Sequence, residues 1–530
     1  MRYSCSLFVA VLCLALLSLP GCGGRRVSVA PCSPCACAAP GAPAGALLAG
    51  IQDVERPFNT ETYDKIDENP FLRVSTRPVS TFAVDVDTAS YSNVRRYLNG
   101  GGLPPTGAVR IEEMVNYFPY DYAGPTGNTP FAVHVDVAGC PWTPAHRLVR
   151  VGIKGKEFAE GKRPPCNLVF LLDVSGSMDS PQKLPLVKRS MQLLLERLGA
   201  RDRIAIVVYA GAAGLVLPST EATKEEAILS AIDNLEAGGS TNGGEGIALA
   251  YATVMKHYKP GGVNRVILAT DGDFNVGMTD QSQLIRMIQQ KAKQGVFLTV
   301  LGFGMGNYKD ATLEKLADKG NGSYGYIDNV MEARKMLVEQ AGGTLVTIAK
   351  DVKIQVEFNP TQVEGYRLIG YENRLLAQED FNDDKKDAGE IGAGHTVTAL
   401  YEIVPSGAGT TLPEVDPLRY QQTPGEPRSA TANDELLFVK VRYKDPDADA
   451  SRLLSWPVRD RGATFAAAPE DFRFAASVAS FGMLLRQSQH KGSATYDDVL
   501  HVAQGALGAD EGGYRAGFLD LVRKAQGVPK

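Results

Sequence analysis

Histidine is scarce in this 530-residue chain, and the few that are present form no metal-binding pair. Only six occur, none in an H-x-x-x-H spacing, so zinc chemistry is not expected. Positive charge is not in excess either: the net charge is −5 and no long basic run occurs, which argues against a nucleic-acid-binding protein. Gly-x-Ser-x-Gly, P-loop and zinc signatures are also missing, so no common enzyme class is indicated.

The N-terminus predicts a targeting signal over residues 1–22. A short positive start precedes an apolar core at residues 6–19, which is too short for a transmembrane anchor. The closing Leu19-Pro20-Gly21-Cys22 resembles the lipobox of bacterial lipoproteins, a resemblance that implies lipidation of Cys22. Gly23 next to it, rather than aspartate, favours outer-membrane sorting. We therefore expect a lipid-anchored protein of the bacterial cell envelope, with a plain secretory signal as the alternative.

The remaining cysteines fit an exported chain. Cys32, Cys35 and Cys37 lie in a Pro/Ala/Gly-rich stretch that predicts a flexible tether, and without a second cluster they are not a strong metal motif. Cys140 and Cys166 are the only cysteines in regions expected to fold. An oxidising compartment would allow these two to pair, so a Cys140–Cys166 disulfide is a hypothesis.

Beyond the tether the pattern alternates between strand-rich and mixed regions. Between residues 164 and 345, apolar strands alternate with amphipathic helices, which predicts an α/β domain with a doubly wound, mostly parallel sheet. Strands before it (131–137 and 148–153) and after it (352–358, 397–404 and 436–443) suggest that this domain is inserted into a β-sandwich built from both flanks. The predicted parts are signal 1–22, tether 23–58, N-terminal region 59–163, α/β domain 164–345, β-rich region 346–460 and helical region 461–530.

The stretch Asn167–Met178 carries the first candidate site. A short apolar run, typical of a strand buried on both faces, ends in Asp173-x-Ser175-x-Ser177. In open α/β sheets ligands bind at this carboxyl edge, and hard oxygen donors suit Mg²⁺ or Ca²⁺. Taken alone, the same stretch also fits a helix N-cap.

Two further strand-end segments complete the candidate site. A glycine-rich loop before a helix presents Thr241, and a second buried strand ends at Asp271. Strand-end loops of a doubly wound sheet converge on one edge, so the three segments can meet there. Both Thr241 and Asp271 are expected on exposed loops.

In this order and on these elements, the five residues resemble the metal-ion-dependent adhesion site of von Willebrand factor type A (VWA) domains. The resemblance implies that Ser175, Ser177 and Thr241 ligate Mg²⁺ (with Ca²⁺ or Mn²⁺ as alternatives) through hydroxyls. Asp173 and Asp271 would act directly or through water. One coordination position would stay open for a carboxylate of a protein partner.

Two other motifs resemble ligand-binding sequences. Gly302-x-Gly304-x-Gly306 follows a strand, but its spacing is not that of a dinucleotide-binding loop, so we expect a tight turn beside the metal site. Asp85-x-Asp87-x-x-Ser90 could suggest a second cation site, but a structural role at a strand-to-helix turn is favoured.

The flanking segments Ser80–Tyr91 and Leu301–Tyr308 resemble those of a bacterial group of VWA lipoproteins with a C-terminal domain of unknown function. The expected function is a membrane-anchored binding module without enzymatic activity, which captures an acidic group of a protein partner through the metal. The alternatives are an envelope hydrolase, whose residues need not be neighbours in sequence, and a scaffold that the metal only stabilises.

Overall fold

The computed structural model describes residues 63–529 except 85–86, 159–161, 240–242, 273–280, 305–309, 341–344, 387, 413–433, 447 and 449. The predicted signal and tether, with Cys22, lie outside the described residues. The chain divides into two units, Met1–Arg56 and Pro57–Lys530, and all that follows concerns the second.

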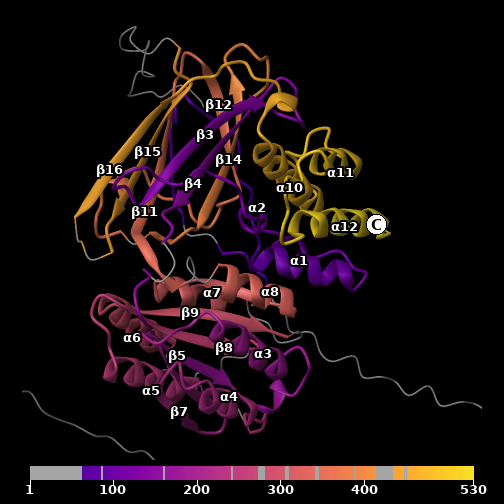
Figure 1. Cartoon of the computed structure of the whole chain (residues 1–530). Helices are drawn as coiled ribbons and strands as arrows, with labels where there is room; N and C mark the ends of the chain where they lie inside the picture. The colour runs from indigo at the N-terminus through magenta and orange to yellow at the C-terminus, as the bar shows by residue number, and fades with distance from the viewer. Residues whose placement is uncertain are drawn as a thin grey trace, which may run out of the picture. The chain divides into compact units, whose positions relative to one another are not determined.

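The α/β domain is built on a six-stranded sheet with the strand order β10-β9-β8-β5-β6-β7 (Figure 1). All neighbouring pairs are parallel except β6 and β7, which form an antiparallel edge. The mostly parallel sheet confirms the predicted fold class; β7 was not predicted, because its exposed edge position leaves little hydrophobic signal. The strands are β5 (Cys166–Asp173), β6 (Arg203–Tyr209), β7 (Ala213–Glu221), β8 (Val263–Thr270), β9 (Val296–Phe303) and β10 (Tyr324–Ile327).

Helices cover both faces of this sheet. Along β5, Leu168, Phe170 and Leu172 share one core with α3, α4 and α8, whereas Val169 and Leu171 share another with α5, α6 and α7. The period-2 alternation of a strand explains why every residue of β5 is buried. The helices are α3 (Leu184–Leu195), α4 (Glu225–Asp233), α5 (Gly243–Lys256), α6 (Gln281–Lys293), α7 (Asp310–Lys319) and α8 (Val330–Arg334), which continues as the π-helical turn η3 (Lys335–Glu339).

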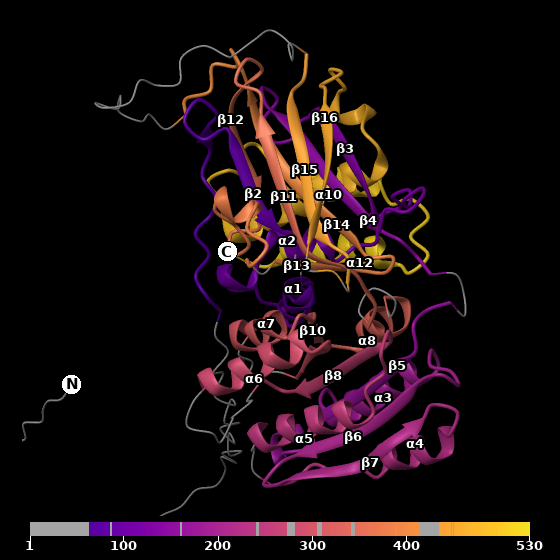
Figure 2. The same ribbon diagram turned by 90° about the vertical axis from the view of Figure 1, so that its left-hand side faces the viewer.

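Two further sheets form a sandwich from segments on both sides of the α/β domain (Figure 2). Strand β4, before the domain, pairs antiparallel with β14, after it, from Thr396↔Lys154 to Ile403↔Arg147. This ladder confirms the predicted insertion. One sheet has the order β1 (Leu72–Arg73), β12 (Val363–Ile369), β14 (Thr396–Pro405), β4 (Arg147–Gly155), β3 (Phe131–Gly139). The other has the order β13 (Gly389–Gly392), β11 (Thr347–Phe358), β15 (Leu437–Lys444), β16 (Ser451–Val458), with β2 (Val79–Ala83) also paired to β11.

The remaining helices pack together beside the sandwich around one aromatic core. Phe472, Ala476, Ala479 and Met483 of the long C-terminal helix are buried in it, so their spacing reflects core packing, as predicted. The helices are α1 (Ala89–Asn99), α2 (Ile111–Asn116), α10 (Glu470–Arg486), α11 (Tyr496–Gln504) and α12 (Tyr514–Gly527). Short 3₁₀ turns are η1 (Thr106–Ala108), η2 (Gly176–Met178), η4 (Glu379–Phe381) and η5 (Phe465–Ala467).

Buried ion pairs join the end of the α/β domain to the N-terminal helices. Arg95 of α1 forms ion pairs with Asp328 and Glu332. The Tyr117 hydroxyl donates to Glu332 at 2.8 Å, and Lys335 Nζ donates to the Tyr117 carbonyl at 2.5 Å. Burial lowers the pKa of Lys335 to about 7, although Glu332 opposes the shift. Charges buried this deeply are tolerated because each has a partner.

The predicted Cys140–Cys166 disulfide is wrong: both cysteines are buried free thiols. Cys166 opens β5 and lies in the core that β5 shares with α3. Cys140 follows β3 and lies in the aromatic core of the C-terminal helices. The two side chains therefore belong to different cores, a separation that sequence spacing does not reveal.

Because burial raises the pKa of both thiols (that of Cys166 to about 11), we expect neither to react in the native protein. Alkylation of the non-reduced protein at pH 8, read peptide by peptide by mass spectrometry, should modify both only after denaturation. A disulfide-linked peptide pair would contradict this assignment.

Glu112 of α2 predicts a pH dependence of stability. Burial, with repulsion from Glu372, raises the pKa of this carboxyl from 4.5 to about 7, against the attraction of Arg486. A folded-state pKa above the unfolded one gives stability that is complete below about pH 4.5 and is lost as the pH rises through 7. In Glu112→Gln, the loss of unfolding free energy between pH 5 and 8 should be smaller by on the order of 3 kcal/mol.

Urea titrations at both pH values measure this, with Glu225→Gln, a change at an exposed glutamate of α4, as the control. An unaltered pH dependence in Glu112→Gln would show that the pKa of this carboxyl is the same in the folded and the unfolded protein.

Candidate metal centre

The loop after β5 places three oxygen-bearing side chains together. Asp173 is the last residue of β5, and Ser175 N donates to Asp173 Oδ1 at 2.9 Å. The extended backbone of Ser175 then leads into the 3₁₀ turn η2. As a result the Ser175 and Ser177 hydroxyl oxygens lie 3.1 Å apart.

Asp173 is held from its other side by the neighbouring strands. Its Oδ2 accepts from the Tyr209 hydroxyl at 3.1 Å, at the end of β6, and from Thr270 Oγ1 at 3.4 Å, at the end of β8. Burial raises the pKa of Asp173, and the nearby charge of Asp271 adds to the shift, whereas the bonds from Ser175 and Tyr209 oppose it. Sequence reasoning missed Tyr209 and Thr270, although both occupy strand ends at the predicted edge.

Asp271 directly follows β8, and it is not exposed as predicted: only 1% of its surface is accessible. Lys183 Nζ, from the residue before α3, donates to Asp271 Oδ2 at 2.8 Å and to the Ser177 carbonyl at 3.0 Å. The lysine was also missed, because nothing in its sequence neighbourhood marks it as facing the site.

The glycine-rich loop meets the same turn through its backbone. Gly238 N donates to the Val174 carbonyl at 2.7 Å, and Gly176 N donates to the Gly239 carbonyl at 3.1 Å. Thr241 itself lies outside the described residues. The described residues nevertheless bring together all three strand-end segments, with Asp173, Ser175, Ser177 and Asp271 at their meeting point.

The donor set fits a hard divalent cation. The site gathers two buried carboxylates, two serine hydroxyls and one ammonium, so its ionised groups leave one net negative charge. Oxygen donors of this kind suit Mg²⁺, Ca²⁺ or Mn²⁺. Within the described part of the chain no three His, Cys, Asp or Glu side chains gather as a metal-binding group, so a metal here would depend on the serine hydroxyls.

The two alternative motifs have structural roles where they are described. Asp87 accepts from Tyr324 N at 2.8 Å and pairs with Arg374 at 3.3 Å, while Ser90 Oγ donates to the Ala108 carbonyl at 2.7 Å. Asp85 lies outside the described residues. Gly304 has φ +76° and a Cβ there would collide with the Lys183 side chain, so it shapes a turn beside the site.

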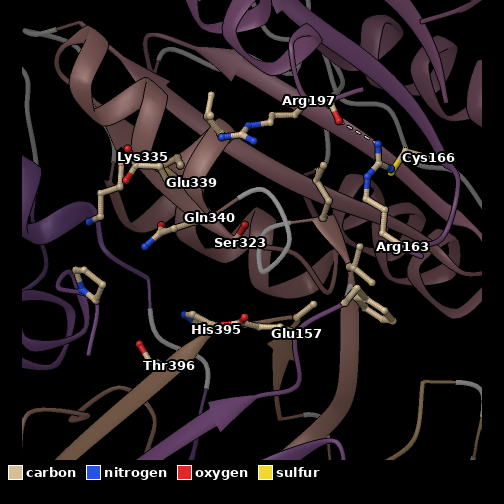
Figure 3. Close-up of a pocket in the computed structure, with 18 of the residues that line it drawn as sticks. Glu157, Arg163, Cys166, Arg197, Ser323, Lys335, Glu339, Gln340, His395 and Thr396 are labelled. Atoms are coloured by element: carbon tan, nitrogen blue, oxygen red, sulfur yellow. Dashed lines mark hydrogen bonds between the residues drawn. The ribbon is translucent and has the colours of Figure 1, made fainter. Parts of the chain in front are cut away.

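A separate cavity of about 1030 Å³ lies between the α/β domain and the sandwich, and none of the candidate metal ligands lines it (Figure 3). Lys335 and Glu339 face it from η3, and His395 and Thr396 from the start of β14. Burial, with repulsion from Lys154, lowers the pKa of His395 to about 4, so this imidazole is neutral at pH 7.

A buried hydrogen-bonded cluster joins residues that lie far apart in the sequence. His146 Nδ1 lies 2.6 Å from Glu402 Oε1, and His146 Nε2 lies 2.9 Å from Thr410 Oγ1. Arg367 also donates to Glu402, at 2.9 Å. Burial alone would raise the pKa of Glu402, but the hydrogen bonds from His146 and Arg367 lower it. The cluster is therefore a buried ion-pair network within the sandwich.

Family models agree with this architecture. A model described as von Willebrand factor type A domain matches residues 167–340, and one described as von Willebrand factor matches residues 57–150. A third, described as the C-terminal part of the uncharacterized protein YfbK, matches residues 343–528. The fold and the matches together define a VWA-domain protein.

Individual relatives narrow this class. The uncharacterized protein YfbK of Escherichia coli (strain K12) is 44% identical over 476 residues, which cover 88% of this chain and 82% of that protein. The chain therefore belongs to the YfbK family of VWA-domain proteins. The uncharacterized protein sll0103 of Synechocystis is 33% identical over 196 residues, 37% of this chain and 45% of that protein. A solved structure, von Willebrand factor type A from Catenulispora acidiphila, is 18% identical, covers 77% of this chain and 90% of that chain, and has a TM-score of 0.40.

Proposed function

We propose that the protein is a membrane-anchored envelope protein whose VWA domain binds a divalent cation, Mg²⁺ first, and through it captures an acidic group of a protein partner. VWA domains commonly mediate metal-dependent protein–protein interaction, and residues 167–340 match that class. The observation that carries the proposal is the cluster of Asp173, Ser175, Ser177 and Asp271 at the carboxyl edge of the sheet.

The chemistry of the ligands explains why a carboxylate would be captured. Ser175 and Ser177, with Thr241, would offer neutral hydroxyl oxygens, while Asp173 already receives hydrogen bonds on both of its oxygens. Neutral donors leave the charge of a divalent cation incompletely offset, and Mg²⁺ favours oxygen ligands. An acidic side chain of a partner would supply the missing negative charge.

Anchoring rests on the sequence. Lipidation of Cys22, outer-membrane sorting and the tether before the folded unit are part of the proposal, as is the absence of enzymatic activity. Among the described residues, no helix is both long and apolar enough to cross a membrane.

Metal binding is tested at Ser177, whose side chain is exposed and bonds to Ser175, so its removal should spare the fold. We expect Mg²⁺ to raise the melting temperature of the wild type, and Ser177→Ala to weaken Mg²⁺ binding about tenfold or more, or about 1.4 kcal/mol. Isothermal titration calorimetry measures the affinity. Ser180→Ala in the same loop is the matched control and should bind like the wild type.

Partner capture is tested by pull-down from an envelope fraction with and without chelator. Retention of a protein in Mg²⁺, and its loss with chelator and in Ser177→Ala, is the expected result. Equal retention in all three samples would contradict capture through the metal. The scaffold alternative predicts that Mg²⁺ raises the melting temperature while every partner stays bound, and the hydrolase alternative predicts activity that survives loss of Asp173.

A further inference from the structure

Lys183 brings a positive charge of the chain itself into the candidate metal centre. Its ammonium lies 2.8 Å from Asp271 Oδ2 and 3.0 Å from the Ser177 carbonyl oxygen. The Asp271 side chain is fully buried and that of Lys183 is 11% accessible, so water screens this pair little.

The surroundings are shaped for this lysine. Gly304, at φ +76°, leaves the space through which the Lys183 methylene groups run, and a Cβ there would meet three of those carbons. The ammonium reaches two fixed acceptors on different segments, the turn η2 and the end of β8. A buried ammonium is costly without such partners, so its place is set by the site rather than by chance contact.

The proposed metal would bind the same Asp271 carboxylate. Asp173 and Asp271 are near enough that the charge of Asp271 acts on the pKa of Asp173. With Lys183 in place, the two carboxylates and one ammonium sum to a single negative charge. A divalent cation bound by Asp271 would lie beside this like charge, and like charges repel more strongly in a largely buried pair than at an exposed surface.

We propose that Lys183 is a tethered counter-ion that competes with the divalent cation for Asp271. In the metal-free protein the ammonium neutralises Asp271 and keeps the loop after β5 joined to the end of β8. The same contact lowers the affinity of the site for metal, so that occupancy follows the cation concentration. This inference rests on the proposed metal binding.

The test replaces Lys183 with glutamine, whose amide can still donate hydrogen bonds but carries no charge. We expect Lys183→Gln to bind Mg²⁺ at least about tenfold more tightly than the wild type in calorimetry, which is about 1.4 kcal/mol. Its metal-free melting temperature should fall, and Mg²⁺ should raise it by more than in the wild type. Lys188→Gln, in the helix α3 that follows Lys183 but bonded to the Asp233 carbonyl away from the site, is the matched control and should behave like the wild type.

The outcomes separate the two claims. Wild-type binding of Mg²⁺ with equal or weaker binding by Lys183→Gln would overturn the role of Lys183 and leave the proposed function standing. Binding by Lys183→Gln alone would support the counter-ion and overturn metal binding by the native site. No binding by either would overturn both. If Lys183→Gln folds only with Mg²⁺, the affinity is measured on Lys183→Met, a second variant without the charge. Tighter Mg²⁺ binding by Lys183→Met than by the wild type then supports the proposal, and equal or weaker binding overturns it.

Discussion

The buried carboxylate of Asp173 is the constraint on which the candidate site depends. It stands at the end of a strand with no exposed residue, and three donors, from the loop after β5 and from the ends of β6 and β8, hold its two oxygens. Burying a carboxylate in this position is unfavourable unless hydrogen bonds compensate it. Those bonds also fix the direction of the chain after β5, so Ser175 and Ser177 emerge at one place. The positions of the Ser175 and Ser177 hydroxyls therefore follow from the hydrogen bonds that the buried Asp173 carboxylate requires.

The sandwich and the α/β domain are joined by a shared apolar core and by buried ion pairs as well as by the chain itself. The core that covers one face of the α/β sheet continues into residues between the two sheets of the sandwich. Between the last helical turns of the α/β domain and the N-terminal helices, a buried polar network joins Arg95, Glu332 and Lys335 with Tyr117. Apolar continuity and paired charges together fix the last helical turns of the domain, where the π-helical turn interrupts the regular helix.

Much of this architecture could be predicted from the sequence, because it follows from local patterns. The apolar runs that end at Asp173 and Asp271 predict both the sheet and the edge that carries the candidate site. The alternation of apolar and polar residues in the flanking strands predicts the sandwich. The sequence did not reveal which side chains lie close together in the folded protein. Lys183, Tyr209 and Thr270 have no pattern that marks them, and the pairing of Cys140 with Cys166 assumed a proximity that separate cores rule out. The β7 edge was missed because an exposed antiparallel strand needs no continuous hydrophobic run.

The insertion of the α/β domain has a mechanical consequence. The chain enters the domain from β4 and leaves it into β11, and these strands belong to different sheets of the sandwich. Each is an interior strand: β4 lies between β14 and β3, and β11 is paired on one side with β15 and on the other with β2 and β13. A force along these strands would load whole ladders of hydrogen bonds in shear, all at once, instead of opening them one by one. The domain is thus attached at two points, and a force that pulls on it would be divided between the two sheets of the sandwich.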